Sequence, residues 1–221
     1  MQPSSSLRRF HRNISTPISN LRKSFCETLV DIPNTETRQV CPKIKLEEAT
    51  NLRDSWLSFA QHLHRHGYLK KITFPSDRRL DIRCFDDSIV KSSIPFAAER
   101  FGYDRPEIAR WLSGKDVQKI VLLGCPTLRR KDIFCAKRLR KFFKIKEANV
   151  CSNCSLKFLC KYANRRAGKT DTKSLNLSDT LRVVVLYASG STHPDLTVLE
   201  EVRSSVVRLM NHTIRLTDSF T

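Results

Sequence analysis

Apolar residues recur at spacings of three and four along most of the chain after residue 45. The clearest run is Leu46, Ala49, Leu52, Trp56, Phe59, Ala60 and Leu63. This spacing predicts an amphipathic helix. We expect it to end near His66, because Gly67 follows and glycine readily adopts the left-handed conformation that closes helices.

Three histidines, His62, His64 and His66, alternate near the end of this helix. Residues two apart do not face each other on a helix, so the three side chains cannot all share one face. We therefore expect them to face solvent or to cap the helix end, where the negative end of the helix dipole favours them. We do not expect them to be metal ligands.

The same spacing predicts a series of shorter helices farther along the chain. They are 88–101, interrupted at Pro95; 105–113, capped by Asp104 and stopped by Gly114; 116–123, closed by Gly124; 129–144; and 179–188, capped by Asn176 or Ser178. A last helix is expected to open at Thr192 or Asp195. Its core stripe is Leu199, Val202, Val206, Leu209 and Met210.

Only one stretch alternates as a strand does. Ile72, Phe74, Leu80 and Ile82 alternate with polar residues on either side of Pro75–Asp77, which is typical of a small β-hairpin. The patterning thus predicts a mainly α fold, a small helical domain over residues 46–216 with one possible hairpin. Residues 217–221 are expected to form a tail.

Composition adds a strong positive charge to this picture. Of 221 residues, 40 are Lys or Arg and 22 are Asp or Glu, a net charge of +18. Residues 129–173 hold 15 basic and 3 acidic residues, and residues 1–45 hold 8 and 3, so the rest of the chain is nearly neutral. A local excess of this kind favours a polyanionic partner, usually nucleic acid.

The N-terminal segment has the composition of a targeting sequence. Arg8, Arg9, Arg12, Arg22 and Lys23 accompany many serines, and no acidic residue precedes Glu27. Organellar transit peptides are Arg-rich, Ser-rich and poor in acids. We expect residues 1–45 to be a mitochondrial transit peptide and linker, with a plastid address as the alternative.

Three cysteines in the basic segment have the spacing of metal ligands. Cys151, Cys154 and Cys160 form a C-x2-C-x5-C motif. Two residues between the first pair let both thiolates point toward one metal ion. The fourth ligand must come from elsewhere, and Cys125 and Cys135 lie upstream. Four thiolates suit structural zinc, and they also suit an iron–sulfur cluster. Zinc is the preferred cofactor.

Other classes of protein are disfavoured. No secretory segment precedes the cysteines, so a disulfide framework is not expected, and no apolar run approaches the length of a membrane span. The chain lacks the glycine-rich phosphate loops and the His-Glu-x-x-His motif of common enzyme classes. We expect no membrane and no small-molecule substrate, and we do not expect an enzyme.

The helix over 129–144 and the residues after it supply the expected contact with RNA. The candidate residues are Arg129, Arg130, Lys137, Arg138, Arg140, Lys141, Lys144, Lys146, Lys157, Arg165 and Arg166. Their side chains would contact phosphates, so the affinity should fall with salt. Phe142 and Phe158 lie among them, and we expect these rings to pack in the core, with stacking on bases as the alternative.

Several short motifs in this region suggest a family. They are Gly124-Cys125-Pro126, Ala136-Lys137-Arg138-Leu139-Arg140, the cysteine motif, Leu177-Ser178-Asp179-Thr180-Leu181-Arg182-Val183, and Glu201-Val202-Arg203. Together they resemble the stretch that precedes the repeated fingers in plant organellar Ran-binding-type zinc-finger proteins. That family includes a variegation-linked protein and zinc-finger factors of organellar RNA editing. The resemblance favours Cys125 as the fourth ligand.

The same resemblance shapes the expected function. The fingers of that family need a Trp and two cysteine pairs, and this sequence has neither Trp nor Cys after Cys160. We therefore expect a non-catalytic accessory factor in RNA editing or transcript processing, with weak electrostatic RNA binding and with editing or processing proteins as partners. A structural subunit of an organellar ribosome and an iron–sulfur nucleic-acid enzyme are the alternatives.

Overall fold

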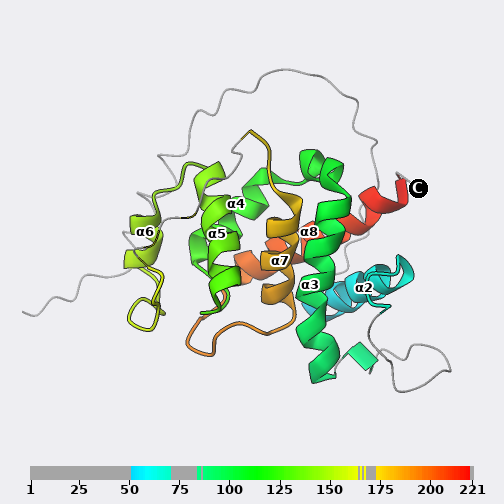
Figure 1. The fold of residues 1–221 in the computed structure, drawn as a ribbon, viewed down its shortest axis with the longest axis horizontal. Coiled ribbons are helices and arrows are strands. Elements are labelled where there is room, and N and C mark those ends of the chain that lie inside the picture. The colour runs from blue at the N-terminus through cyan, green and yellow to red at the C-terminus, as the bar shows by residue number, and fades with distance from the viewer. Residues whose placement is uncertain are drawn as a thin grey trace, which may run out of the picture. The chain divides into compact units, whose positions relative to one another are not determined.

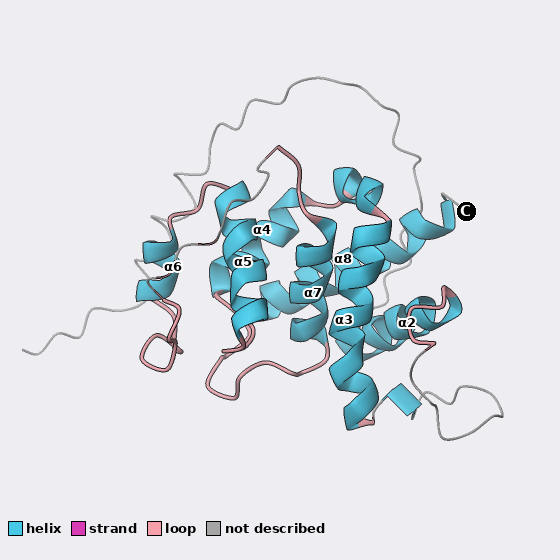
Figure 2. Ribbon diagram, in the orientation of Figure 1, coloured by secondary structure: helices cyan, strands magenta, loops and turns pink. Residues whose placement is uncertain are grey.

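The computed structural model describes residues 51–70, 84–85, 87–163, 165, 167 and 173–219, and its regular elements there are helices (Figure 1). These are α2 (Leu52–Arg65), α3 (Ser88–Asp104), the 3-10 helix η3 (Pro106–Trp111), α4 (Gly114–Leu123), α5 (Arg130–Phe142), α6 (Glu147–Ser152), α7 (Leu177–Ala188) and α8 (Glu200–Ser219). No strand occurs in these residues, so the mainly α prediction is confirmed (Figure 2). Residues 71–83 of the predicted hairpin lie outside them.

Helix α7 is the centre of the fold. It contacts α2, α3, α5, α8 and η3, and every residue from Asp179 to Ala188 is buried. Figure 1 shows α7 between α3 and α5, with α8 behind it. A helix that is buried on all sides needs partners on all sides. Asn176 caps the helix as expected, because its side chain accepts a hydrogen bond from the Asp179 N–H at 3.0 Å.

The amphipathic prediction for the first described helix holds. The apolar stripe of α2, with Trp56, Phe59 and Leu63, is buried. Asn51 caps its start, and Gly67 follows its end with a φ of +80°. Glycine reaches this left-handed conformation without steric cost, which accounts for the stop.

Pro95 does not interrupt α3, contrary to the sequence prediction. The helix continues from Ser88 to Asp104 with Pro95 inside it. A proline within a helix costs about 3 kcal/mol, because it removes one backbone hydrogen bond and crowds the preceding turn. Burial offsets this cost: Pro95, Ile94, Ala98 and Phe101 are all buried on a helix that packs along α7.

Two other predicted boundaries were wrong. Gly114 starts α4 instead of stopping the preceding helix, and Ser113 caps α4 by accepting from the Asp116 N–H. Asp104 lies in the last turn of α3 and caps nothing.

The last helix, α8, starts at Glu200 and not at Thr192 or Asp195. The backbone N–H of His193 donates to the Pro126 carbonyl at 2.9 Å, which holds this segment as a loop over the α4–α5 connection. Leu199 is 47% exposed and stands at the helix entry, outside the core stripe.

A buried ion pair joins α5 to α7. The Asp132 carboxylate and the Arg182 guanidinium are both buried, with two N–O distances of 2.7 Å. Thr127 donates to the other oxygen of Asp132 at 2.6 Å. Arg182 also reaches Glu99 on α3 at 2.9 Å. Because each partner has further hydrogen bonds, neither charge is left uncompensated in the interior.

Helices α3 and α7 approach each other at Gly102. A Cβ atom placed there would lie 2.6 Å from the backbone Cα and N of Ser178. Backbone atoms cannot move aside as a flexible side chain can. Glycine at this position therefore lets the start of α7 lie directly on α3.

We predict that Gly102→Ala destabilises the fold by about 1–3 kcal/mol, as overpacking typically does. Helix propensity alone would favour alanine by about 1 kcal/mol. A loss of stability must therefore come from the clash between the new Cβ atom and Ser178. Gly114→Ala is the matched control, because its nearest atom would be Phe143 Cε1 at an ordinary 3.7 Å. Urea unfolding measures both. Equal stability of the two variants would contradict the close approach of the helices.

Candidate metal centre

Four of the predicted cysteine ligands line one cavity. Cys125 follows α4, Cys151 lies in α6, and Cys154 and Cys160 lie in the turns after it. The cavity has a volume of about 20 Å³. That space holds about one water-sized particle. A single metal ion is of that size.

Local structure explains how the cysteines meet. Gly124 ends α4 with a φ of +139°, and its missing Cβ would lie 3.5 Å from Cys154 Sγ. The short helix α6, which the sequence analysis did not predict, carries Cys151 into the cavity. The residues 151–160, here called the cysteine loop, continue as a series of turns held by i to i+3 backbone bonds. Buried Leu156 anchors them to the core.

Two basic side chains of α5 also line this cavity. The Arg140 guanidinium is fully buried and donates to Cys125 Sγ at 3.4 Å and to the Gly124 carbonyl at 3.2 Å. Lys137 is 1% exposed, and its ammonium pairs with Glu147 at 2.7 Å and donates to the carbonyls of Ala163 and Arg165. Positive groups at a thiol site favour the thiolates that metals bind.

Burial and charge act in opposite directions on the thiols. Burial raises the pKa of Cys125, Cys151 and Cys154 above the ordinary value of a thiol. The nearby Arg140 guanidinium offsets part of this increase. Thiolates must form before a metal can bind, and a bound cation would supply the missing charge compensation. The donor set is therefore chemically suited to zinc. No three of the four sulfurs that line the cavity lie within 4.8 Å of one another, so binding would draw the cysteine loop inward.

Cys135, the alternative fourth ligand, lies elsewhere. It is buried in α5, does not line the cavity, and accepts a hydrogen bond from Arg138 at 3.3 Å. Burial raises its pKa, as does the nearby Asp179 carboxylate. Cys135 therefore remains a neutral core thiol, and the structure leaves Cys125 as the cysteine that faces the other three.

The structure corrects part of the predicted RNA contact. Lys137 and Arg140 are buried, so they cannot reach RNA. Arg138 is bound through two nitrogens to Asp179 on α7. The remaining described candidates are exposed: Arg129, Arg130, Lys141, Lys144, Lys146, Lys157 and Arg165. Arg166 lies outside the described residues.

Phe158 also differs from its prediction. Its ring is 93% exposed, at the outer face of the cysteine loop, and does not pack in the core. Phe142 is half-buried and meets Phe143 edge to face at 4.9 Å.

The expected solvent-facing role of the histidines is wrong for His62. Its side chain is fully buried, and neither ring nitrogen has a hydrogen-bond partner. His66 and Asp218 lie beside it. The spacing of four between His62 and His66 was the signal in the sequence, because residues i and i+4 share a helix face. Nothing in the sequence indicated Asp218.

Known proteins offer no relative to guide the assignment: no protein-family model, curated protein or solved structure matches this chain. None of the helices in the described part of the chain is long and apolar enough to cross a membrane.

We predict that the protein, purified without oxygen, carries about one thiolate-bound zinc ion per chain. The variant Cys154→Ser should lose this zinc ion. It should also unfold at a lower temperature, because a structural metal contributes folding free energy. Cys84→Ser is the matched control, since Cys84 is a free, half-buried cysteine outside the cavity. Elemental analysis for zinc and iron, with thermal unfolding, measures both variants. Folded wild-type protein with less than about half an equivalent of thiolate-bound metal would contradict the site.

Proposed function

We propose that this protein is a non-catalytic accessory factor of organellar RNA metabolism that acts in RNA editing or transcript processing. The observation that carries the proposal is the outer face of the cysteine loop. Phe158 is 93% exposed there, Lys157 lies over its ring, and Lys161 and Arg165, which follow in the sequence, are exposed as well. An exposed ring among cations is suited to single-stranded RNA, where bases stack on the ring and the cations contact phosphates.

The proposed metal would serve this face by holding the loop in shape. The cysteine loop has no regular secondary structure after α6, and its backbone bonds span only three residues. A zinc ion bound by Cys125, Cys151, Cys154 and Cys160 would supply the folding energy that such a loop lacks. Lys157 lies over the Phe158 ring at 5.7 Å, so charge and ring are presented together.

Exposed cations of α5 and of the segment after it could add further phosphate contacts. Lys141, Lys144 and Lys146 are exposed. Such contacts are to the RNA backbone and carry no sequence information. We therefore propose that protein partners in an editing or processing complex choose the RNA site. The resemblance to plant organellar zinc-finger factors supports this assignment, and the Arg-rich N-terminal segment supports a mitochondrial location.

We predict that Lys157→Glu/Phe158→Ala weakens binding to a single-stranded RNA oligonucleotide. Loss of one stacked base costs about 1–3 kcal/mol, or roughly 5- to 150-fold in affinity. Charge reversal should weaken binding further and flatten the salt dependence of the affinity. Fluorescence anisotropy over a range of salt concentrations measures these effects.

The double substitution Arg100→Glu/Tyr103→Ala is the matched control. It removes an exposed arginine and an aromatic ring that is 80% exposed, both on α3, with the same change in charge. We expect its RNA affinity to stay close to the wild type. Equal affinities of the two double variants would reject the cysteine loop as the RNA contact, and the absence of RNA binding by the wild type would reject the proposed function.

In cells, we predict that the protein is recovered with mitochondria and sediments apart from ribosomes at high salt. A plant line that lacks it should show reduced editing or altered processing at a subset of organellar transcripts. Sequencing of organellar RNA and gradient sedimentation test this. Co-sedimentation with ribosomes at high salt would assign the protein to the ribosome instead, and unchanged transcripts would contradict a role in editing or processing.

A further inference from the structure

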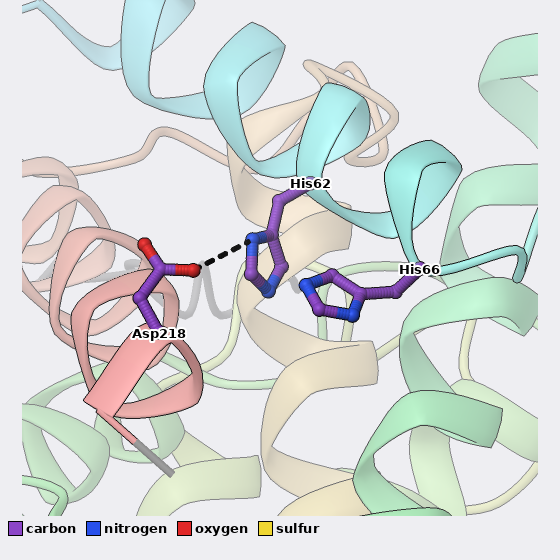
Figure 3. A group of neighbouring side chains, drawn as sticks. All are labelled: His62, His66 and Asp218. Carbon is purple, nitrogen blue, oxygen red and sulfur yellow. Dashed lines mark ion pairs between the residues drawn. The ribbon is translucent and has the colours of Figure 1, made fainter. Parts of the chain in front are cut away.

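A second cluster of potential metal ligands lies away from the cysteines, where α2 meets α8. His62 and His66 come from the last turn and the C-cap of α2, and Asp218 comes from the last turn of α8. One ligand atom of each residue lies within 4.8 Å of the other two. Figure 3 shows the ring of His62 between the Asp218 carboxylate and the ring of His66.

We propose that His62, His66 and Asp218 form a binding site for a divalent transition metal ion of the zinc type. Two imidazoles and one carboxylate are a common donor set for zinc, and three protein ligands leave one position for water or another ligand. Imidazole also selects against magnesium and calcium, which prefer oxygen.

The burial of His62 carries this proposal. The side chain is fully buried, yet neither Nδ1 nor Nε2 has a hydrogen-bond partner. Buried polar atoms are nearly always satisfied, and an exception calls for a specific explanation such as an ion. The rings of Phe59 and Phe101 lie 6.5 Å and 5.8 Å from the imidazole and fix its position without satisfying its nitrogens.

An ion pair with Asp218 does not explain the arrangement. Burial lowers the pKa of His62 to about 4, with smaller effects of His66 and Arg65 in the same direction and of Asp218 in the opposite one. The Asp218 carboxylate lies 4.0 Å from Nδ1 of His62, beyond hydrogen-bond distance, so both ring nitrogens remain without a hydrogen-bond partner.

Helix electrostatics also favour a cation at this place. Both α2 and α8 end here, and the C-terminus of a helix carries a partial negative charge. A carboxylate in the last turn of α8 is unfavourable for that helix by itself, and a bound cation would reverse the effect. Arg65 is the one basic side chain in the last turn of α2 besides the histidines, and it is exposed.

The site needs only a small adjustment to bind. Zinc ligands at the usual bond lengths lie roughly 3.4 Å apart, closer than the present limit of 4.8 Å. His66 and Asp218 are both exposed, whereas His62 is buried in the core. Binding would connect the ends of two helices that are 152 residues apart between His66 and Asp218, so it should raise the unfolding temperature.

Titration of the metal-free full chain with Co²⁺ and then Zn²⁺ tests the proposal. The charge-transfer absorption between thiolate and cobalt reports the cysteines alone. We expect the chain to bind a further equivalent of metal ion in addition to any that the cysteines bind. This second equivalent should add no thiolate absorption and should raise the unfolding temperature. His66→Gln and Asp218→Asn should each abolish or greatly weaken this equivalent. Both residues are exposed, so the variants should fold, and His64→Gln is the matched control.

The outcomes separate this site from the cysteine cavity and from RNA binding. The site is supported if His66→Gln and Asp218→Asn lose the equivalent of metal ion that binds without thiolate absorption while His64→Gln keeps it. This result would support the site even if the cysteines bind no metal. If the wild type binds no thiolate-free equivalent, or if both variants keep it, the site is wrong and His62 is only a packed core ring. The RNA affinity of the variants should stay unchanged in either case.

Discussion

The ion pair between Asp132 and Arg182 holds the central helix in place. It lies in the core between α5 and α7, and Arg182 reaches across to Glu99 on α3. Three of the helices around the core are thus connected by one buried network. Such a pair contributes little net energy compared with apolar residues, but breaking it leaves a buried charge, which costs about 3–5 kcal/mol. The network therefore specifies the rotation of α5 and α7 more than it stabilises them.

That rotation decides what the basic helix does. Besides Asp132, α5 buries Lys137 and Arg140: Arg140 meets Cys125, and Lys137 pairs with Glu147. Lys141 stays in solvent. The positive charge of this segment therefore has two roles: the inner cations complete the cysteine cavity and the outer ones remain for a polyanionic partner.

The proposed metal sites stand at opposite ends of the helical unit. Figure 1 shows α6, which carries Cys151, far from α2, which carries His62 and His66. The first would bind within a loop made of turns, and the second would connect the ends of α2 and α8. The two proposed sites can be removed separately by mutation.

The sequence by itself determined the helical class, most helix positions and the cysteines that face one another. Spacings of three and four reveal helices, because the periodicity is a local property, and the C-x2-C-x5-C motif reveals potential ligands for the same reason. It could not show that Pro95 lies inside α3, because the packing that offsets a proline comes from α7, more than 80 residues away. Burial of Lys137, Arg140 and His62 was equally hidden, since these residue types normally lie at the surface. Only the tertiary structure supplied the partners of Lys137 and Arg140 and brought Asp218 to the histidines, because contacts distant in sequence leave no periodic signal in a single chain.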